Sequence, residues 1–273
     1  MRQSRLLALF LGGVVLLSLA GCSKLRARDE LNRGVRAYKG GQYGNAIEHF
    51  QRAIELDPEL LNARVYLATA YATQFVPGSP AEENQKLGEA AIREFEKVLE
   101  EDPGNVTALG YIASIYFGLA KPHQVTEAMP FLDKAKEFRQ RLIEVEPQNP
   151  EHYYSIGVID WNITYQRNQQ LRTDLGRLQP DVRLPTRPRR SLAELNGELV
   201  EEGITMLERA LEVDPGYLDA MSYLNLMYRQ KADIVESIQE REDYIDRADE
   251  LVERYLRLRK QHQKSETATA AIP

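Results

Sequence analysis

The residue with the most distinctive chemistry in this chain is Cys22, which is the only cysteine and directly follows Leu19-Ala20-Gly21. A thiol is a nucleophile that can be modified, and a single thiol excludes a disulfide within the chain. The segment before it carries two arginines and then an almost entirely apolar run from Leu6 to Leu19. A charged start, an apolar stretch and small residues at its end are the layout of a secretory signal, and the stretch is shorter than the roughly 20 residues of a spanning helix.

The sequence Leu19-Ala20-Gly21-Cys22 resembles the lipobox of bacterial lipoproteins. The resemblance implies that residues 1–21 are a signal peptide removed before Cys22, and that Cys22 carries the lipid, palmitate included. Lipoproteins carry more than one acyl chain, and several chains hold a protein firmly where one holds it marginally. The resemblance also implies a lipid-anchored protein on the periplasmic side of the cell envelope, and Ser23 favours the outer membrane over the inner. The alternative is an uncleaved membrane anchor with an incidental cysteine.

The other reactive side chains show no catalytic or metal-binding spacing. The four histidines are scattered, and the sequence has no Gly-x-Ser-x-Gly elbow and no phosphate-binding glycine-rich loop. We therefore expect a protein that is not an enzyme and that needs no metal and no cofactor. The 41 acidic residues outnumber the 35 lysines and arginines, which argues against a nucleic-acid partner. The four histidines are His49, His123, His152 and His262.

Helices must position any functional residue here, because from Asp29 the chain alternates amphipathic helical segments with short breaks that contain proline. Proline cannot continue a helix, and it moves the residue before it out of the α region. Four similar breaks therefore predict four helix ends and indicate an internal repeat. They are Asp57-Pro58, Asp102-Pro103, Glu146-Pro147 and Asp214-Pro215.

The repeat resembles the tetratricopeptide repeat, a hairpin of two helices whose second helix has the pattern Ala-x3-aromatic-x2-Ala-x4-Pro. The chain fits this pattern fully at Ala46, Phe50, Ala53 and Pro58. It fits less closely around the other three prolines. In the first helix of the fourth hairpin, Asp160 stands where the family pattern has a tyrosine. Because one hairpin cannot bury its apolar face, several must stack. The resemblance implies an all-α solenoid of about five hairpins over residues 29–260, after a lipidated tether at 22–28 and before a disordered tail at 261–273.

The prolines are farther apart than the family period of about 34 residues, so we expect insertions within the hairpins, between their two helices. Such insertions either emerge on a binding face or only lengthen the helices. The largest spans residues 162–199, and its arginines could bind an anionic ligand such as a lipid headgroup, a phosphate-bearing glycan or an acidic partner. The arginines gather in Arg167–Arg190, and the prolines at 180, 185 and 188 predict that the second half of this stretch is non-helical. A solvated loop, or a loop held on the acidic surface of the protein itself, is the alternative. The candidate residues are Arg183, Arg187, Arg189 and Arg190.

In the tetratricopeptide family the first helices line a concave wall that holds a peptide or a helix of another protein. Tryptophan, tyrosine and arginine are frequent anchors of such interfaces. The resemblance therefore implies a membrane-anchored scaffold for another envelope protein, an accessory in envelope assembly or transport. Two alternatives remain: the rings are core residues, or the insertions bind a wall glycan in a ligand-binding or enzymatic envelope protein. The wall residues that we single out are Tyr38, Phe117, Tyr154, Trp161 and Arg229.

Overall fold

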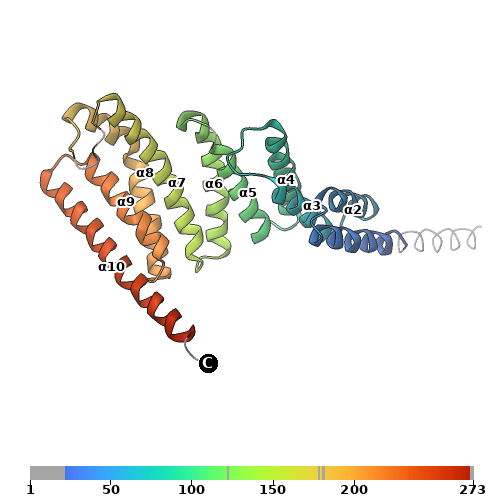
Figure 1. The fold of residues 1–273 in the computed structure, drawn as a ribbon. Coiled ribbons are helices and arrows are strands. Elements are labelled where there is room, and N and C mark those ends of the chain that lie inside the picture. The colour runs from blue at the N-terminus through green and yellow to red at the C-terminus, as the bar shows by residue number, and fades with distance from the viewer. Residues whose placement is uncertain (1–21, 122, 178, 180–181, 271–273) are drawn as a thin grey trace, which may run out of the picture. The chain divides into compact units, whose positions relative to one another are not determined.

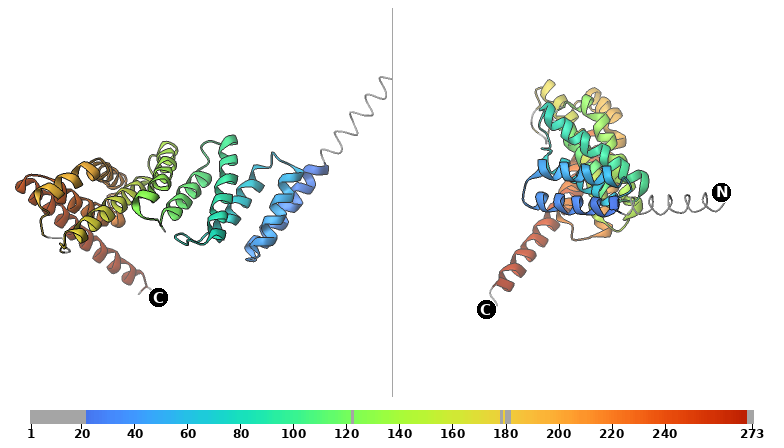
Figure 2. Two further views of the ribbon diagram at one scale, coloured as in Figure 1. Left: turned by 90° about the horizontal axis from the view of Figure 1, so that it is seen from above. Right: turned by 90° about the vertical axis from the view of Figure 1, so that its right-hand side faces the viewer.

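The computed structural model describes residues 22–121, 123–177, 179 and 182–270 of the 273-residue chain. The described residues form helices joined by turns and short loops, and they contain no strand. The chain divides into two compact units, Met1–Pro122 and His123–Pro273, and each unit is described by itself. Within each unit, helices that follow one another in the sequence pack together as antiparallel neighbours (Figures 1 and 2). The fold class, an all-α solenoid of helical hairpins, is confirmed.

Unit 1 contains an N-terminal helix at residues 22–39, followed by α2 (Tyr43–Leu56), α3 (Leu61–Gln74), α4 (Glu82–Glu101) and α5 (Val106–Ala120). Its core follows the expected repeat, because Ala46, Phe50 and Ala53 are fully buried on one face of α2. Gly34 lies against the Phe50 ring, where a side chain would overlap the ring. Small residues at these places therefore let the two helices of the first hairpin approach closely.

Unit 2 contains α6 (Val125–Val145), α7 (Pro150–Asp174), α8 (Thr186–Val213), α9 (Leu218–Ile234) and α10 (Ile238–Ala270). Consecutive helices pack on one another, and α7 also contacts α9. The same small-residue rule applies, because a side chain at Gly157 would overlap Leu207 and one at Gly203 would overlap Met227. The third expected hairpin would consist of α5 and α6, which fall in different units.

All four proline breaks end a helix as expected. The residues Asp57, Asp102, Glu146 and Asp214 are the C-caps of α2, α4, α6 and α8. Their φ values lie between −148° and −127° and their ψ values between 67° and 95°, outside the α region. Each cap N–H still donates to the carbonyl four residues earlier. The local steric effect of proline is therefore enough to set these boundaries.

The insertions mostly lengthen helices. The helices α7 and α8 have 25 and 28 residues, and only residues 175–185 separate them. Our expectation that the second half of the arginine-rich insertion is non-helical is wrong from Thr186 onward. Pro188 lies in the first turn of α8, where a missing N–H costs nothing because the first N–H groups of a helix have no intrahelical partner.

The two ends of the repeat region also differ from expectation. Residues 22–28, expected as a tether, are helical, and Ala27 is fully buried. At the other end, α10 continues to Ala270, past position 261 where we expected a disordered tail to begin. No proline or glycine interrupts residues 251–270, and good helix formers dominate there. The predicted signal at 1–21 lies outside the described residues. In the described part of the chain, no helix is both long enough and apolar enough to span a bilayer.

Candidate partner-binding groove

A groove with a volume of about 550 Å³ lies in unit 2 between α7, α9 and α10. Its apolar lining comes from all three helices, with Trp161 and Tyr165 on α7, Leu226 on α9 and Ile245 on α10. Amide and charged side chains complete the lining. They are Asn168, Gln169, Arg172, Arg229, Gln230, Asp233 and Arg241. We call this the α7–α9–α10 groove.

Helical periodicity explains why these residues share the groove. On α7, Trp161, Tyr165, Asn168 and Arg172 are separated by four, three and four residues, which places them on one face. On α9, the residues from Leu226 to Asp233 follow the same rule. The lengthening of α7 beyond the usual repeat supplies Tyr165, Asn168 and Arg172. The insertion therefore builds the far part of the groove.

A continuous run of aromatic rings leads along α7 and α9 into the groove. The Trp161 and Tyr165 rings stack with centroids 4.9 Å apart, and Tyr223 meets Trp161 edge-on at 5.1 Å. Tyr154 contacts Tyr223 at 5.6 Å and Tyr217 at 5.2 Å. We call these five residues the aromatic ladder. Rigid half-buried rings of this kind give a large contact area at a low entropic cost.

The polar atoms of the ladder include tyrosine hydroxyls that stay protonated and, within the described residues, a tryptophan N–H without an acceptor. Burial raises the pKa of Tyr154 to about 12, with the charges of neighbouring groups acting in the same direction, so its phenol is neutral at physiological pH. Burial and a hydrogen bond to Glu151 also raise the pKa of Tyr217. Within the described structure, the Trp161 Nε1 atom is buried and has no hydrogen-bond partner. A buried donor without an acceptor costs about 1–3 kcal/mol.

A buried polar network forms one end of the groove. Arg172 is only 1% exposed and donates to Asn168 Oδ1 at 3.0 Å and to Asp233 Oδ1 at 2.8 Å. It also donates to the carbonyls of Gln179 and Val182, which ties these two residues to the buried network. Asn168 in turn donates to Gln230 Oε1 at 2.9 Å and to Asp233 Oδ2 at 2.8 Å. The network therefore engages both carboxylate oxygens of Asp233, the only acidic residue among the described residues of the lining.

The lining that remains available at the groove surface is cationic. Arg229 is exposed and forms an ion pair with Asp249 at 2.6 Å, with the two side chains 45% and 62% exposed. Arg241 on α10 also lines the groove and pairs with Glu242 at 3.0 Å, but its side chain is only 14% exposed. An exposed pair such as that of Arg229 and Asp249 contributes little to stability, so a ligand carboxylate can replace Asp249 at small cost.

The structure brings together only some of the wall residues that we singled out. Trp161 and Arg229 line one groove, and Tyr154 joins it through the aromatic ladder. Tyr38 and Phe117 lie in unit 1 instead. The Tyr38 hydroxyl is 2.8 Å from Thr73 Oγ1, and Lys121 Nζ lies 5.5 Å from the centre of the Phe117 ring.

The four candidate arginines of the insertion mostly contact their own unit. Arg183 donates to the Glu236 carbonyl, and Arg190 forms an ion pair with the Glu236 carboxylate at 2.6 Å. That ion pair lowers the pKa of Glu236. Arg189 is 7% exposed and donates to the Leu184 carbonyl, whereas Arg187 is exposed. This arrangement favours the alternative of a loop held on the protein's own surface.

Sequence reasoning missed Tyr165, Tyr217 and Tyr223, although a signal for Tyr223 was present. Tyr223 stands eight residues after Pro215, as Tyr66 and Tyr111 stand eight residues after their own repeat prolines. Tyr66 stacks on Phe50 and Tyr111 stacks on Phe95 with interplanar angles of 17° and 11°. The repeat thus places an aromatic ring at this position three times, and in unit 2 it joins the ladder.

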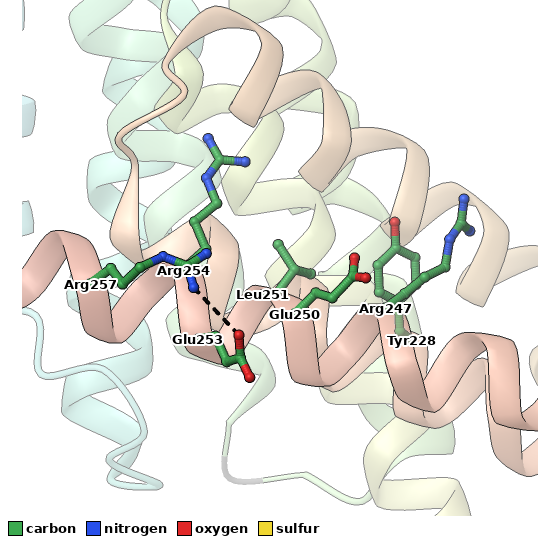
Figure 3. A pocket seen from close by; sticks show the side chains of 7 residues that line it. All are labelled: Tyr228, Arg247, Glu250, Leu251, Glu253, Arg254 and Arg257. Atoms are coloured by element: carbon green, nitrogen blue, oxygen red, sulfur yellow. Dashed lines mark hydrogen bonds and ion pairs between the residues drawn. The ribbon is translucent and has the colours of Figure 1, made fainter.

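A second hollow of about 370 Å³ lies between α9 and α10 (Figure 3). Its guanidinium groups are engaged within the unit. Arg257 pairs with Glu253 at 3.4 Å, Arg247 lies over the Tyr228 ring at 5.3 Å, and Arg254 donates to the Pro215 carbonyl. The α7–α9–α10 groove is the larger of the two and has the more apolar lining. It is therefore the stronger candidate.

The fold and the groove define an all-α helical-repeat protein. Residues 34–74 match the family described as TPR repeat, which is the tetratricopeptide repeat. This match covers only part of unit 1, and the fold of the described residues is an all-α solenoid. No protein among the curated sequences matches it.

Solved structures show the same fold at low sequence identity. A MamA RS-1 ArsTM double mutant is 16% identical, with a TM-score of 0.54 over 88% of this chain and 97% of that chain. A crystal structure of MamA protein is also 16% identical, with a TM-score of 0.52 over 85% and 94% of the two chains. YrrB, described as a TPR protein with an unusual peptide-binding site, is 16% identical, with a TM-score of 0.48 over 86% and 90%. The likeness to the two MamA structures concerns the fold alone.

Proposed function

We propose that this protein is a non-enzymatic interaction scaffold of the bacterial cell envelope. A lipid on Cys22 anchors it, and the α7–α9–α10 groove binds a peptide segment or a helix of another protein. The observation that carries the proposal is the aromatic ladder ending in this groove. A half-buried tryptophan beside an exposed arginine is the composition of an interface hot spot. A volume of about 550 Å³ is also in the range of sites that hold a ligand or a side-chain cluster.

The groove chemistry indicates what the bound segment contains. Trp161, Leu226 and Ile245 offer an apolar surface for an aromatic or aliphatic anchor. Arg229 offers a guanidinium to a carboxylate of the partner, which would replace Asp249. Charge-assisted hydrogen bonds of this type are about twice as strong as neutral ones. We therefore propose a segment that combines an apolar anchor with at least one acidic residue.

The envelope location rests on the sequence. Cys22 is exposed, so its thiol is accessible in the described structure. We propose that lipidation at Cys22 holds the protein on the periplasmic side, with the outer membrane favoured by Ser23, as an accessory in envelope assembly or transport. The alternative of a glycan-binding or enzymatic protein has less support, because Arg183, Arg189 and Arg190 are engaged within unit 2.

The partner-binding part is tested by photo-crosslinking in cells. A photo-crosslinker at Gln169, in the groove, should give one dominant protein adduct, and the same crosslinker at the exposed Glu198 on α8 should not. The adduct should disappear in Arg229→Glu, a surface change that leaves the core intact. Equal adducts from both positions, or an adduct insensitive to Arg229→Glu, would count against the groove.

The anchor is tested separately. Mass spectrometry of the N-terminal peptide from the membrane fraction should show a mature chain that begins at Cys22 and carries acyl groups. The Cys22→Ala variant should appear in the soluble fraction. An unmodified Cys22 preceded by residues 1–21 would favour the uncleaved anchor instead.

A further inference from the structure

The helical conformation of residues 22–28 determines how the proposed lipid anchor is connected to unit 1. These residues are continuous with the rest of the N-terminal helix, and Ala27 packs into unit 1 with no exposed surface. A lipid on Cys22 would therefore be attached to a rigid helix and not to a flexible linker. The first turns of this helix must then lie at the surface of the bilayer that holds the lipid.

The side chains in these turns are cationic and apolar. Lys24, Arg26 and Arg28 are all exposed, and the first acidic residue after Cys22 is Asp29. Leu25 between them is 71% exposed, which is high for a large hydrophobic side chain. The chain as a whole has a formal net charge of −6, so this is a local reversal of sign. We call Lys24, Leu25, Arg26 and Arg28 the basic patch.

The basic patch is available to a ligand. Among the described residues, the only ion pair within it joins Lys24 to Glu59 at 3.1 Å, and both side chains are mostly exposed, at 57% and 83%. Such a pair exchanges readily for another anion. Successive residues of a helix are rotated by about 100°, so the four side chains surround the helix except on the side of Ala27. The end of the helix, and not one flat face, is therefore the contacting surface.

Distance along the helix places the whole patch near the membrane. With a rise of about 1.5 Å per residue, Arg28 lies roughly 9 Å along the axis from Cys22. The screening length at physiological ionic strength is about 8 Å. All three cations thus lie within about one screening length of a headgroup layer at Cys22.

We propose that the basic patch binds the anionic phospholipid headgroups of the membrane that holds the anchor. This inference rests on the proposed lipidation of Cys22. Each cation near an anionic surface strengthens binding about fivefold, so three together give on the order of a hundredfold. Leu25 adds apolar contact with the interface. The patch and the lipid would act as two signals, which hold unit 1 directly on the bilayer.

The experiment uses the fact that Cys22 is the only thiol. The chain from Cys22 to Pro273 is coupled at Cys22 to a maleimide that carries one myristoyl-length chain, because a single chain binds membranes only marginally and leaves the patch measurable. Partition is measured onto phosphatidylcholine vesicles and onto vesicles with about 30% phosphatidylglycerol. The test variant is Lys24→Gln/Arg26→Gln/Arg28→Gln. The control is Arg93→Gln/Arg257→Gln/Arg259→Gln, which removes three exposed cations elsewhere.

The unaltered chain should bind the anionic vesicles on the order of a hundredfold more tightly than the test variant. The two should bind phosphatidylcholine equally, and the control should behave as the unaltered chain. Equal binding of the test variant and the unaltered chain to anionic vesicles would overturn the proposal. An equal loss in the control would also overturn it, because net charge and not the patch would then be responsible. The acyl chain is attached chemically, so the result does not depend on whether cells lipidate Cys22 or on the groove.

Discussion

Unit 1 and unit 2 use the same hairpin but fill it differently. In unit 1 the places between helices hold apolar and aromatic residues, as where Phe50 packs against Gly34 and stacks on Tyr66. In unit 2 polar groups occupy corresponding repeat positions, and also positions in the lengthened part of α7. Asp160 occupies the place of Tyr71 in unit 1, is fully buried, and accepts from Lys136 Nζ at 2.6 Å. The unit that departs from the repeat is also the one with the groove.

The difference shows how a repeat acquires a specific site. Apolar side chains at the repeat positions stabilise the stack, but they do not distinguish one hairpin from another. A buried polar network, in contrast, is satisfied by only one arrangement of its helices. The network around Arg172 needs the lengthened α7, the 175–185 loop and α9 together. Breaking a buried charged pair is costly because it leaves the partner buried and uncompensated. We therefore expect unit 2 to respond to single polar substitutions more strongly than unit 1 does.

The largest effect is expected for Arg172→Met. It leaves Asp233 Oδ1, Asn168 Oδ1 and two loop carbonyls without the donor that Arg172 supplies, so unit 2 should lose about 3–5 kcal/mol of unfolding free energy. Urea unfolding followed by the fluorescence of Trp161, the only tryptophan, reports on unit 2 directly. The control is Arg190→Met, which breaks only the exposed pair with Glu236 and should change little. A similar midpoint for both variants would mean that the network does not hold the groove.

The next effect concerns binding. Trp161→Ala should weaken the affinity for the crosslinked partner segment by about 2 kcal/mol or more, which is roughly thirtyfold, because it removes the central ring of the ladder. Titration calorimetry with a synthetic peptide of that segment measures the change. Tyr66→Ala removes an aromatic ring of unit 1 that is 39% exposed and should leave the affinity unchanged. Equal losses would remove the functional distinction between the units.

A smaller effect is expected from pH. Burial raises the pKa of the Asp160 carboxyl to about 7, with Glu202 and Asp133 acting in the same direction and Lys136 opposing them. A pKa raised above the unfolded value of 3.8 means that the folded state binds the proton more tightly, so this group stabilises unit 2 as the pH falls through about 7. Between about pH 8 and pH 6 the unfolding free energy should rise by about 1–2 kcal/mol.

The Asp160→Asn variant should remove this pH dependence, because an amide cannot titrate. The carboxyls whose pKa is lowered, such as Glu146 and Glu236, lose stability only below their ordinary range, so they do not interfere in this window. An unchanged slope in Asp160→Asn would show that another group of unit 2 is responsible.

Local rules explain which parts of the fold were predictable. The four proline breaks end helices because the effect of proline is confined to its neighbours. Trp161 and Arg229 line the same groove, and both stand in the regular part of the repeat. Tyr165 and Arg172 lie beyond that part, in a lengthened helix whose register no repeat pattern defines. The contacts of Arg172 with the Gln179 and Val182 carbonyls depend on a loop far from α9 in the sequence, which local patterns do not report.

The smallest effect is expected at the surface of the groove in unit 2. It tests whether the partner replaces Asp249 in the ion pair with Arg229. Asp249→Asn frees Arg229 from its exposed partner and should tighten binding of the acidic partner segment a few-fold, whereas Arg229→Gln should weaken it a few-fold. The double variant should match Arg229→Gln, because Asp249 acts only by competing for that guanidinium. The difference should shrink as salt is raised, since screening weakens interactions between exposed charges. Weaker binding by Asp249→Asn would mean that the Arg229–Asp249 ion pair stabilises the binding-competent groove. It would then contradict the proposal that a carboxylate of the partner replaces Asp249.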